Sequence, residues 1–285
     1  MRLTLWQIPG SRIGQIFLVS IVCLIVVSAQ PSNTKSISAK NQLAAEEIWD
    51  RVIEAKGGRA ALHRVSSVQG SSSSTSRTNL GDAYPLTSVF LAVLPHKVWT
   101  CEDARPSVFG VTSLMLNYED MTSYFALPGR ENKTVALTQL QRSRRDYQNT
   151  TILYLTESRW LKPRIVAARE DIVDRIPGYI VETDVDGRRV DFFVDRTTYL
   201  PNRIDFHNVG PDAIVHTSKA ILSDYKVVDG VKVPHRLSFE GSSPASETIR
   251  FNVDYDPEIF VKPPSKITPD SWKKSQGKGG RPSLL

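Results

Sequence analysis

Hydrophobic and polar residues alternate in short runs through most of the chain after residue 65. Near the end of the chain, for example, Ile249, Phe251 and Val253 alternate with Arg250 and Asn252. Successive side chains of a β-strand point to opposite faces of the sheet, so this spacing predicts strands with one apolar face and one face toward water. The chain is therefore expected to be rich in strands.

Several of these runs are joined by very short connections. Strands are expected at residues 179–185, 189–195, 200–207, 214–228, 231–239 and 248–255, and the runs SVQGSSSSTSRT and LTSVFLAVLPHKVWTCE predict earlier ones. Asp186-Gly187 and Asp229-Gly230 are strong signals of two-residue hairpin turns. Strands that are joined in this way pair antiparallel.

Two segments depart from the alternating pattern. Leu43, Ile48 and Val52 have helical spacing, and Gly57-Gly58 follows them as a C-terminal stop, which predicts an amphipathic helix. Residues 134–163 also lack alternation and predict one or two helices that end at Pro163. The strand-rich chain thus contains an N-terminal helix and a central helical segment.

The fold class that follows is α+β and mostly β. With about ten strands, a flat sheet would present more apolar surface than these helices could cover, so the sheet is expected to curve strongly around the N-terminal helix and a central helical lid as an incomplete barrel. The apolar side chains expected to line its concave side are Phe90, Leu137, Leu140, Phe192, Val194, Phe206, Leu237, Phe239 and Phe251.

The first residues have the layout of a secretory signal peptide. Arg2 and Arg12 precede an apolar run at residues 16–27, which small residues follow, so residues 1–29 are expected to be removed on export to the periplasm. The alternative is an uncleaved membrane anchor. A helix over residues 13–29 would span roughly 25 Å, against about 30 Å for a bilayer core.

The remaining chain is expected to form one domain. Residues 30–40 have the composition of a linker, residues 41–264 contain the predicted elements, and residues 265–285 have that of a flexible basic tail. The full chain has a net charge of +6, to which Arg2 and Arg12 contribute. A nearly neutral body gives little support for nucleic-acid binding.

Reactive side chains form no recognised catalytic pattern in the sequence. Cys101 is the only cysteine outside the signal, which excludes an intramolecular disulfide and makes a structural role more plausible than a nucleophilic one. His207 and His216 with Asp205 could form a weak metal site, but solvent-facing strand positions explain them better. We therefore expect no enzyme activity, no metal and no cofactor.

Several structural motifs of the chain resemble those of the LolA-like group of periplasmic outer-membrane lipoprotein-sorting proteins. They are the Gly57-Gly58 stop, the turn formed by Asp195, Thr198 and Pro201, and a closing Phe-x-x-Pro at residues 260–263. The resemblance covers residues 43–263. It implies an incomplete barrel whose helices form a lid over an apolar cavity for acyl chains.

Two functions are compatible with these expectations. The first is an exported, monomeric, non-enzymatic carrier that binds a lipid or a lipidated protein under the helical lid. The second is an envelope interaction or stress-sensor module with a solid core that binds a protein partner, such as an envelope membrane protein. A hollow or a filled concave side distinguishes the two.

Overall fold

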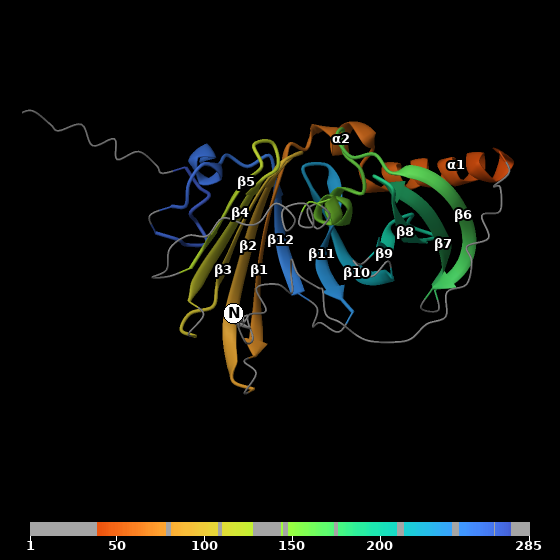
Figure 1. Ribbon diagram of the computed structural model, residues 1–285. Coiled ribbons are helices and arrows are strands. Elements are labelled where there is room, and N and C mark those ends of the chain that lie inside the picture. The colour runs from red at the N-terminus through yellow and green to blue at the C-terminus, as the bar shows by residue number, and fades with distance from the viewer. Residues whose placement is uncertain are drawn as a thin grey trace, which may run out of the picture.

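The fold is a single open sheet of 12 strands that curves around helices, as the computed structural model in Figure 1 shows. The strand order is β5-β4-β3-β2-β1-β12-β11-β10-β9-β8-β7-β6, and all neighbours are antiparallel. The end strands β5 and β6 do not pair, so the barrel is incomplete. The structure describes residues 39–77, 81–107, 110–127, 144, 148–173, 176–209, 214–240, 245–264 and 266–274.

The strands form two series of sequential neighbours that meet where β1 pairs with β12. The first series is β1 (Ser67–Arg77), β2 (Ala83–Val93), β3 (Lys97–Asp103), β4 (Val111–Asn117) and β5 (Thr122–Ala126). The second is β6 (Arg164–Val173), β7 (Ile176–Val185), β8 (Arg188–Asp195), β9 (Pro201–Val209), β10 (Val215–Val228), β11 (Val231–Phe239) and β12 (Ala245–Phe251). Strand β6 was not expected from the sequence.

The helices are α1 (Ala39–Lys56), α2 (Arg59–Arg64), a helical segment at residues 148–155 and the 3-10 helix η2 (Pro257–Phe260). Among the described residues, no helix is long and apolar enough to cross a membrane.

The predicted turns are confirmed, and their geometry explains the residues that form them. Asp186 and Gly187 have φ values of 53° and 78°, and Asp229 and Gly230 have 50° and 84°. Positive φ at both central residues is the geometry that two-residue hairpins favour. In the turn before β9, Asp195 Oδ1 accepts hydrogen bonds from the Thr198 N–H and hydroxyl, which explains the Asp-x-x-Thr spacing.

The largest hydrophobic core lies between the helices and one face of the sheet, which we call the helix face. Helix α1 packs against β6, β7 and β11, and it places Trp49 4.9 Å from Phe192 between ring centroids. Val52 of α1 and Ile152 of the segment at 148–155 are both fully buried in this core. The predicted curved sheet around an N-terminal and a central helix is therefore confirmed.

The opposite face of the sheet, the outer face, differs from the expectation of a wet surface. At β2, β3 and β4 it carries a second core that includes Leu91, Trp99 and Met115. The chain after β12 covers this core with Phe260 and Trp272, and Figure 1 shows this blue segment beside β4 and β5.

The order of residues in these strands explains the second core. Strand β2 has the consecutive apolar residues Val89, Phe90, Leu91 and Ala92, which is typical of a strand that is buried on both faces. Because Trp272 is buried, the packed part of the chain extends beyond residue 264, where we expected the domain to end.

Lys56, the last residue of α1, is fully buried inside the half-barrel. Its Nζ donates a hydrogen bond of 2.8 Å to the carbonyl oxygen of Tyr154 and lies 5.3 Å from the ring centroid of Tyr225. No carboxylate among the described residues pairs with it. Burial lowers the pKa of Lys56 to about 7 because a charged ammonium group is poorly solvated there.

Lys56 should therefore make folding stability depend on pH. Its pKa is about 7 in the folded chain, against 10.5 ordinarily, so the unfolded chain binds more protons between these values and stability rises with pH. Lys56→Met should raise the free energy of unfolding near pH 7 by on the order of 4 kcal/mol, less about 1 kcal/mol for the lost hydrogen bond. This gain should disappear near pH 10.

Urea unfolding at the two pH values checks the prediction, with the exposed Lys232→Met as the matched control. An equal effect of Lys56→Met at both pH values would show that Lys56 is not held in its neutral form.

Candidate functional site

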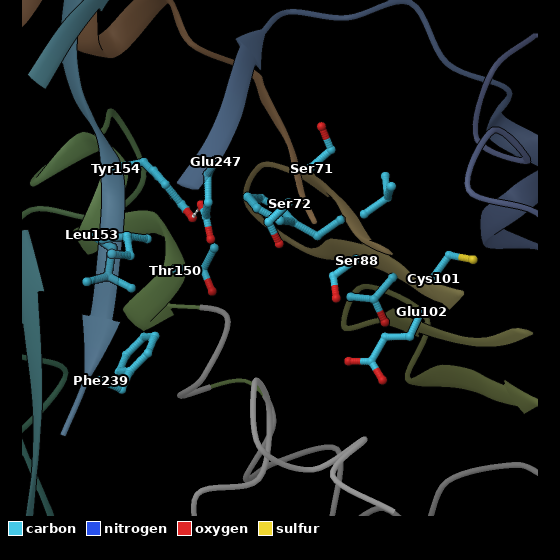
Figure 2. A pocket seen from close by; sticks show the side chains of 14 residues that line it. Ser71, Ser72, Ser88, Cys101, Glu102, Thr150, Leu153, Tyr154, Phe239 and Glu247 are labelled. Atoms are coloured by element: carbon cyan, nitrogen blue, oxygen red, sulfur yellow. Dashed lines mark hydrogen bonds between the residues drawn. The ribbon is translucent and has the colours of Figure 1, made fainter. Parts of the chain in front are cut away.

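An open pocket lies on the helix face where the two series of strands meet. It has a volume of about 630 Å³, including the part that opens to solvent. Strands β1, β2, β3, β11 and β12 and the helical segment at 148–155 surround it, and Figure 2 shows its side chains. The lining residues are Ser71, Ser72, Ser88, Val89, Phe90, Thr100, Cys101, Glu102, Thr150, Leu153, Tyr154, Leu237, Phe239 and Glu247.

Strand register arranges part of this lining as a polar row across four strands. Ser72 of β1 pairs with Glu247 of β12 on one side and with Ser88 of β2 on the other. Ser88 in turn pairs with Glu102 of β3. Because paired residues point to the same face, the two glutamates stand at the two ends of a row whose middle consists of hydroxyl groups. Figure 2 shows this order from Glu247 to Glu102.

The neighbouring row is mainly apolar, and Gly70 leaves room in it for the ring of Phe90. Gly70 pairs with Ile249 and Phe90. A Cβ at position 70 would lie 2.0 Å from Cε1 of Phe90, so the Phe90 ring occupies the space that any other side chain would fill. From there the ring stacks on Tyr154, with centroids 5.6 Å apart and planes 25° apart. This contact closes one side of the pocket with aromatic surface.

Burial raises the pKa of both glutamates of the polar row. Burial raises the pKa of Glu102 to about 7 and the pKa of Glu247 to about 7, because the ionised form is poorly solvated. Glu247 accepts a hydrogen bond from the Tyr154 hydroxyl, which lowers its pKa by less than burial raises it. Near neutral pH the pocket therefore contains two carboxyl groups that are each partly protonated.

Buried polar contacts hold the helical segment that forms the other wall of the pocket. Lys56 binds the backbone of Tyr154, as described above. Just after the segment, the buried Glu157 accepts hydrogen bonds from Trp49 Nε1 at 3.3 Å and Arg59 Nε at 2.8 Å, and it lies 3.1 Å from His63 Nε2. The wall is thus fixed to α1 and α2.

Of the residues that were expected to line a cavity, some line the pocket and others lie in the packed core. Phe90, Leu237 and Phe239 line the pocket. Four others lie in the packed core of the helix face, and their exposed fractions are at most 5%: Phe192, Val194, Phe206 and Phe251. Leu137 and Leu140 lie outside the described residues. Among the described residues, the concave side is therefore filled near β8 and β9, and the pocket lies near β1 and β2.

Sequence reasoning missed the polar members of the pocket, although a signal was present. Glu247 has the same strand phase as Ile249 and Phe251, so an acidic residue occupies a position of the apolar face. Glu102 likewise shares its phase with Val98. An acidic residue that is in phase with core residues indicates a buried carboxyl group.

The other reactive side chains that the sequence singled out do not belong to the polar row. Burial raises the pKa of the Cys101 thiol to about 12, and its sulfur points away from the pocket in Figure 2, so it is a neutral thiol near pH 7. On the outer face, His207 Nε2 lies 3.1 Å from Asp191 and His207 Nδ1 3.0 Å from Thr217. The described residues contain no group of three or more His, Cys, Asp or Glu side chains that could hold a metal ion.

Solved structures of similar shape exist at low sequence identity. A LolA superfamily protein from Nitrosomonas europaea is 13% identical with a TM-score of 0.49, and the match covers 76% of this chain and 97% of that one. A DUF1329 family protein from Desulfovibrio piger is 14% identical with a TM-score of 0.45, covering 76% and 96%. A domain named for outer-membrane lipoprotein sorting, from Vibrio parahaemolyticus, is 11% identical with a TM-score of 0.41, covering 76% and 97%.

A scan of protein-family models and a search of curated proteins find no match. The first and third structures carry the name of the group that the sequence motifs resemble. The class of protein that the strands and helices define is an open half-barrel with a partly filled concave side.

The close approach of Gly70 and Phe90 can be tested by substitution. Gly70→Ala should displace the Phe90 ring from Tyr154 and lower the free energy of unfolding by about 1–3 kcal/mol, the usual cost of an overpacked site. In a Phe90→Ala background the same change should cost much less, because the clashing ring is absent. Urea unfolding of the four proteins in this cycle measures the difference. An unchanged cost in the second background would contradict the described contact.

Proposed function

We propose that this protein is a non-enzymatic carrier that binds the acyl chain of a lipid or of a lipidated protein in the pocket between β1–β3 and the helical segment at 148–155. The observation that supports this function is the pocket itself, whose walls include Phe90, Leu153 and Phe239. The volume of about 630 Å³ includes open solvent, so the apolar lining and not the size of the pocket supports the proposal.

The binding of an acyl chain needs apolar surface more than reactive groups. Each buried methylene contributes about 0.8 kcal/mol, so ten methylenes would contribute roughly 8 kcal/mol before the cost of ordering the chain. The stacked rings of Phe90 and Tyr154 supply apolar surface on the side of the pocket that they close. A carrier of this kind requires no catalytic group.

The filled part of the concave side limits where a chain can lie. Trp49 and Phe192 pack edge to face under α1, and Phe206 is also buried there. These side chains occupy the space near β8 and β9, so the proposed site is confined to the region of β1, β2 and β12. A site outside the cytoplasm agrees with the signal peptide that residues 1–29 predict.

The proposed function is tested with an uncharged acyl probe, a fatty-acid methyl ester that carries an anthroyloxy fluorophore. The wild-type protein should bind it, and Phe239→Glu should weaken binding at least about tenfold, because a charge would enter the apolar wall. Native mass spectrometry of protein purified without detergent should also show a bound lipid.

The matched control is Ile221→Glu, which makes the same kind of change on the same hairpin. Phe239 pairs with the buried Ala220, whereas Ile221 is 48% exposed on the outer face. The control should bind the probe as the wild type does. Failure of the wild-type protein to bind any acyl probe, or equal loss in the two variants, would refute the proposed function.

One observation supports a second candidate function, the binding of a protein partner in the cell envelope. Val209 and Val215 pair across the ends of β9 and β10 and are 57% and 58% exposed. Exposed apolar residues that adjoin each other are common at protein interfaces.

This alternative predicts that Val215→Asp abolishes the capture of a specific envelope protein and that Phe239→Glu preserves it. Affinity purification from envelope extracts of both variants provides the measurement. Loss of capture with Phe239→Glu alone would assign the interaction to the pocket instead.

A further inference from the structure

The polar row of the pocket narrows the class of ligand. We infer that the pocket prefers an acyl lipid whose polar end carries a primary amine over one whose polar end is a carboxylate or an uncharged hydroxyl group. This inference rests on the proposed function, because it assumes that an acyl chain occupies the apolar wall.

The first step is the charge of the lining. Among the described lining residues, the ionisable side chains are Glu102, Glu247, Tyr154 and Cys101, and none is a lysine, arginine or histidine. A carboxylate ligand would place a further negative charge beside the two glutamates with no described cation to compensate for it. An ammonium group would instead be compensated by the glutamate beside which it lies.

The second step is the direction of hydrogen bonding. An ammonium group donates three hydrogen bonds and accepts none, so it needs a site rich in acceptors. The row from Glu247 through Ser72 and Ser88 to Glu102 contains two carboxyl groups and two hydroxyl oxygens on one face of the sheet. Three strand spacings separate its ends, roughly 14 Å, so an amine within the row lies near one carboxyl group and next to a hydroxyl.

The third step distinguishes the two glutamates. Glu247 already accepts a hydrogen bond from the Tyr154 hydroxyl. No described residue forms a hydrogen bond or ion pair with the side chain of Glu102. Glu102 is therefore the carboxyl group with free capacity to accept from a ligand, and Glu247 contributes mainly its charge.

The titration of these groups gives the inference a second, independent consequence. The pKa of each glutamate is about 7, whereas burial raises the pKa of Tyr154 well above its usual value and that of Cys101 to about 12. Among the described lining residues, only the glutamates thus titrate near neutral pH. Lys56, whose pKa is also about 7, is not a lining residue but donates to the backbone of Tyr154. Because an ammonium ion favours the ionised carboxylates, its affinity should rise from pH 6 to pH 8, about one unit on either side of that pKa.

Calorimetric titrations of the wild-type protein with dodecylamine, dodecanol and dodecanoate, each below its micelle concentration, test the inference. These ligands share one chain and differ in the polar end. Dodecylamine should bind at least about tenfold more tightly than dodecanol near pH 8, and dodecanoate should bind most weakly. Lowering the pH to about 6 should weaken the binding of dodecylamine severalfold and leave dodecanol unchanged.

Variants then assign the effect to residues. Glu102→Gln should remove most of the preference for dodecylamine and keep dodecanol affinity within about twofold, because shape is preserved and charge is lost. Glu240→Gln is the matched control, since Glu240 is exposed next to Phe239 and forms an ion pair with Lys219. It should leave all three affinities unchanged. The comparison of the three ligands on the wild-type protein does not depend on the folding of any variant.

The outcomes separate this inference from the function on which it rests. Equal affinities for the three ligands, or tighter binding of dodecanoate, would overturn the preference for an amine while the acyl carrier remained supported. Failure of all three to bind would overturn both. Binding of dodecylamine alone with no change in Glu102→Gln would place the amine elsewhere and overturn the assigned site.

Discussion

The need to cover an apolar sheet face determines most of this structure. A sheet of 12 strands with unpaired ends cannot bury its own faces, so other segments have to cover them. On the helix face, α1, α2 and the segment at 148–155 do so, and the sheet curves to reach them. On the outer face near β2–β4, the chain that follows β12 supplies the cover. The pocket lies where the described helices do not cover the helix face.

Tyr154 connects the helical segment at 148–155 to the pocket. Its carbonyl oxygen accepts from Lys56, its hydroxyl donates to Glu247, and its ring stacks on Phe90. Burial acts in opposite directions on the two ionisable partners, lowering the pKa of Lys56 and raising that of Glu247. Both shifts favour the neutral form, which is how a lysine and a carboxyl group can share one apolar interior without forming an ion pair.

The alternating residues and the Asp-Gly turns allowed the antiparallel curved sheet to be predicted, because strand phase and turn chemistry are local properties. The second core could not be deduced in the same way. Trp272 lies in a segment whose lysines and glycines are typical of a disordered end, and only its packing against Ile259 and Phe260 in the folded chain reveals its role. The filled and open parts of the concave side also depend on contacts between distant residues, such as Trp49 with Phe192.

Candidate site prediction was limited for a related reason. Phe90, Leu237 and Phe239 were identified by their apolar phase, but Phe192 and Phe251 have the same phase and lie in the core. Phase defines the face of a sheet and not the distance to the opposing helix. The glutamates carried a usable signal, since each is in phase with core residues of its strand, and a search for acidic residues in apolar phase would have found Glu247.

The pairing of β1 with β12 has a consequence for the order in which the fold is completed. Both series of strands consist of neighbours in sequence and can form from local contacts. The pairing of Val68 with Phe251, in contrast, joins residues near the two ends of the domain. The polar row crosses this seam, with Ser72 on one side and Glu247 on the other. A chain that is still emerging from a ribosome or a translocation channel therefore cannot assemble the polar row until its last strand is available.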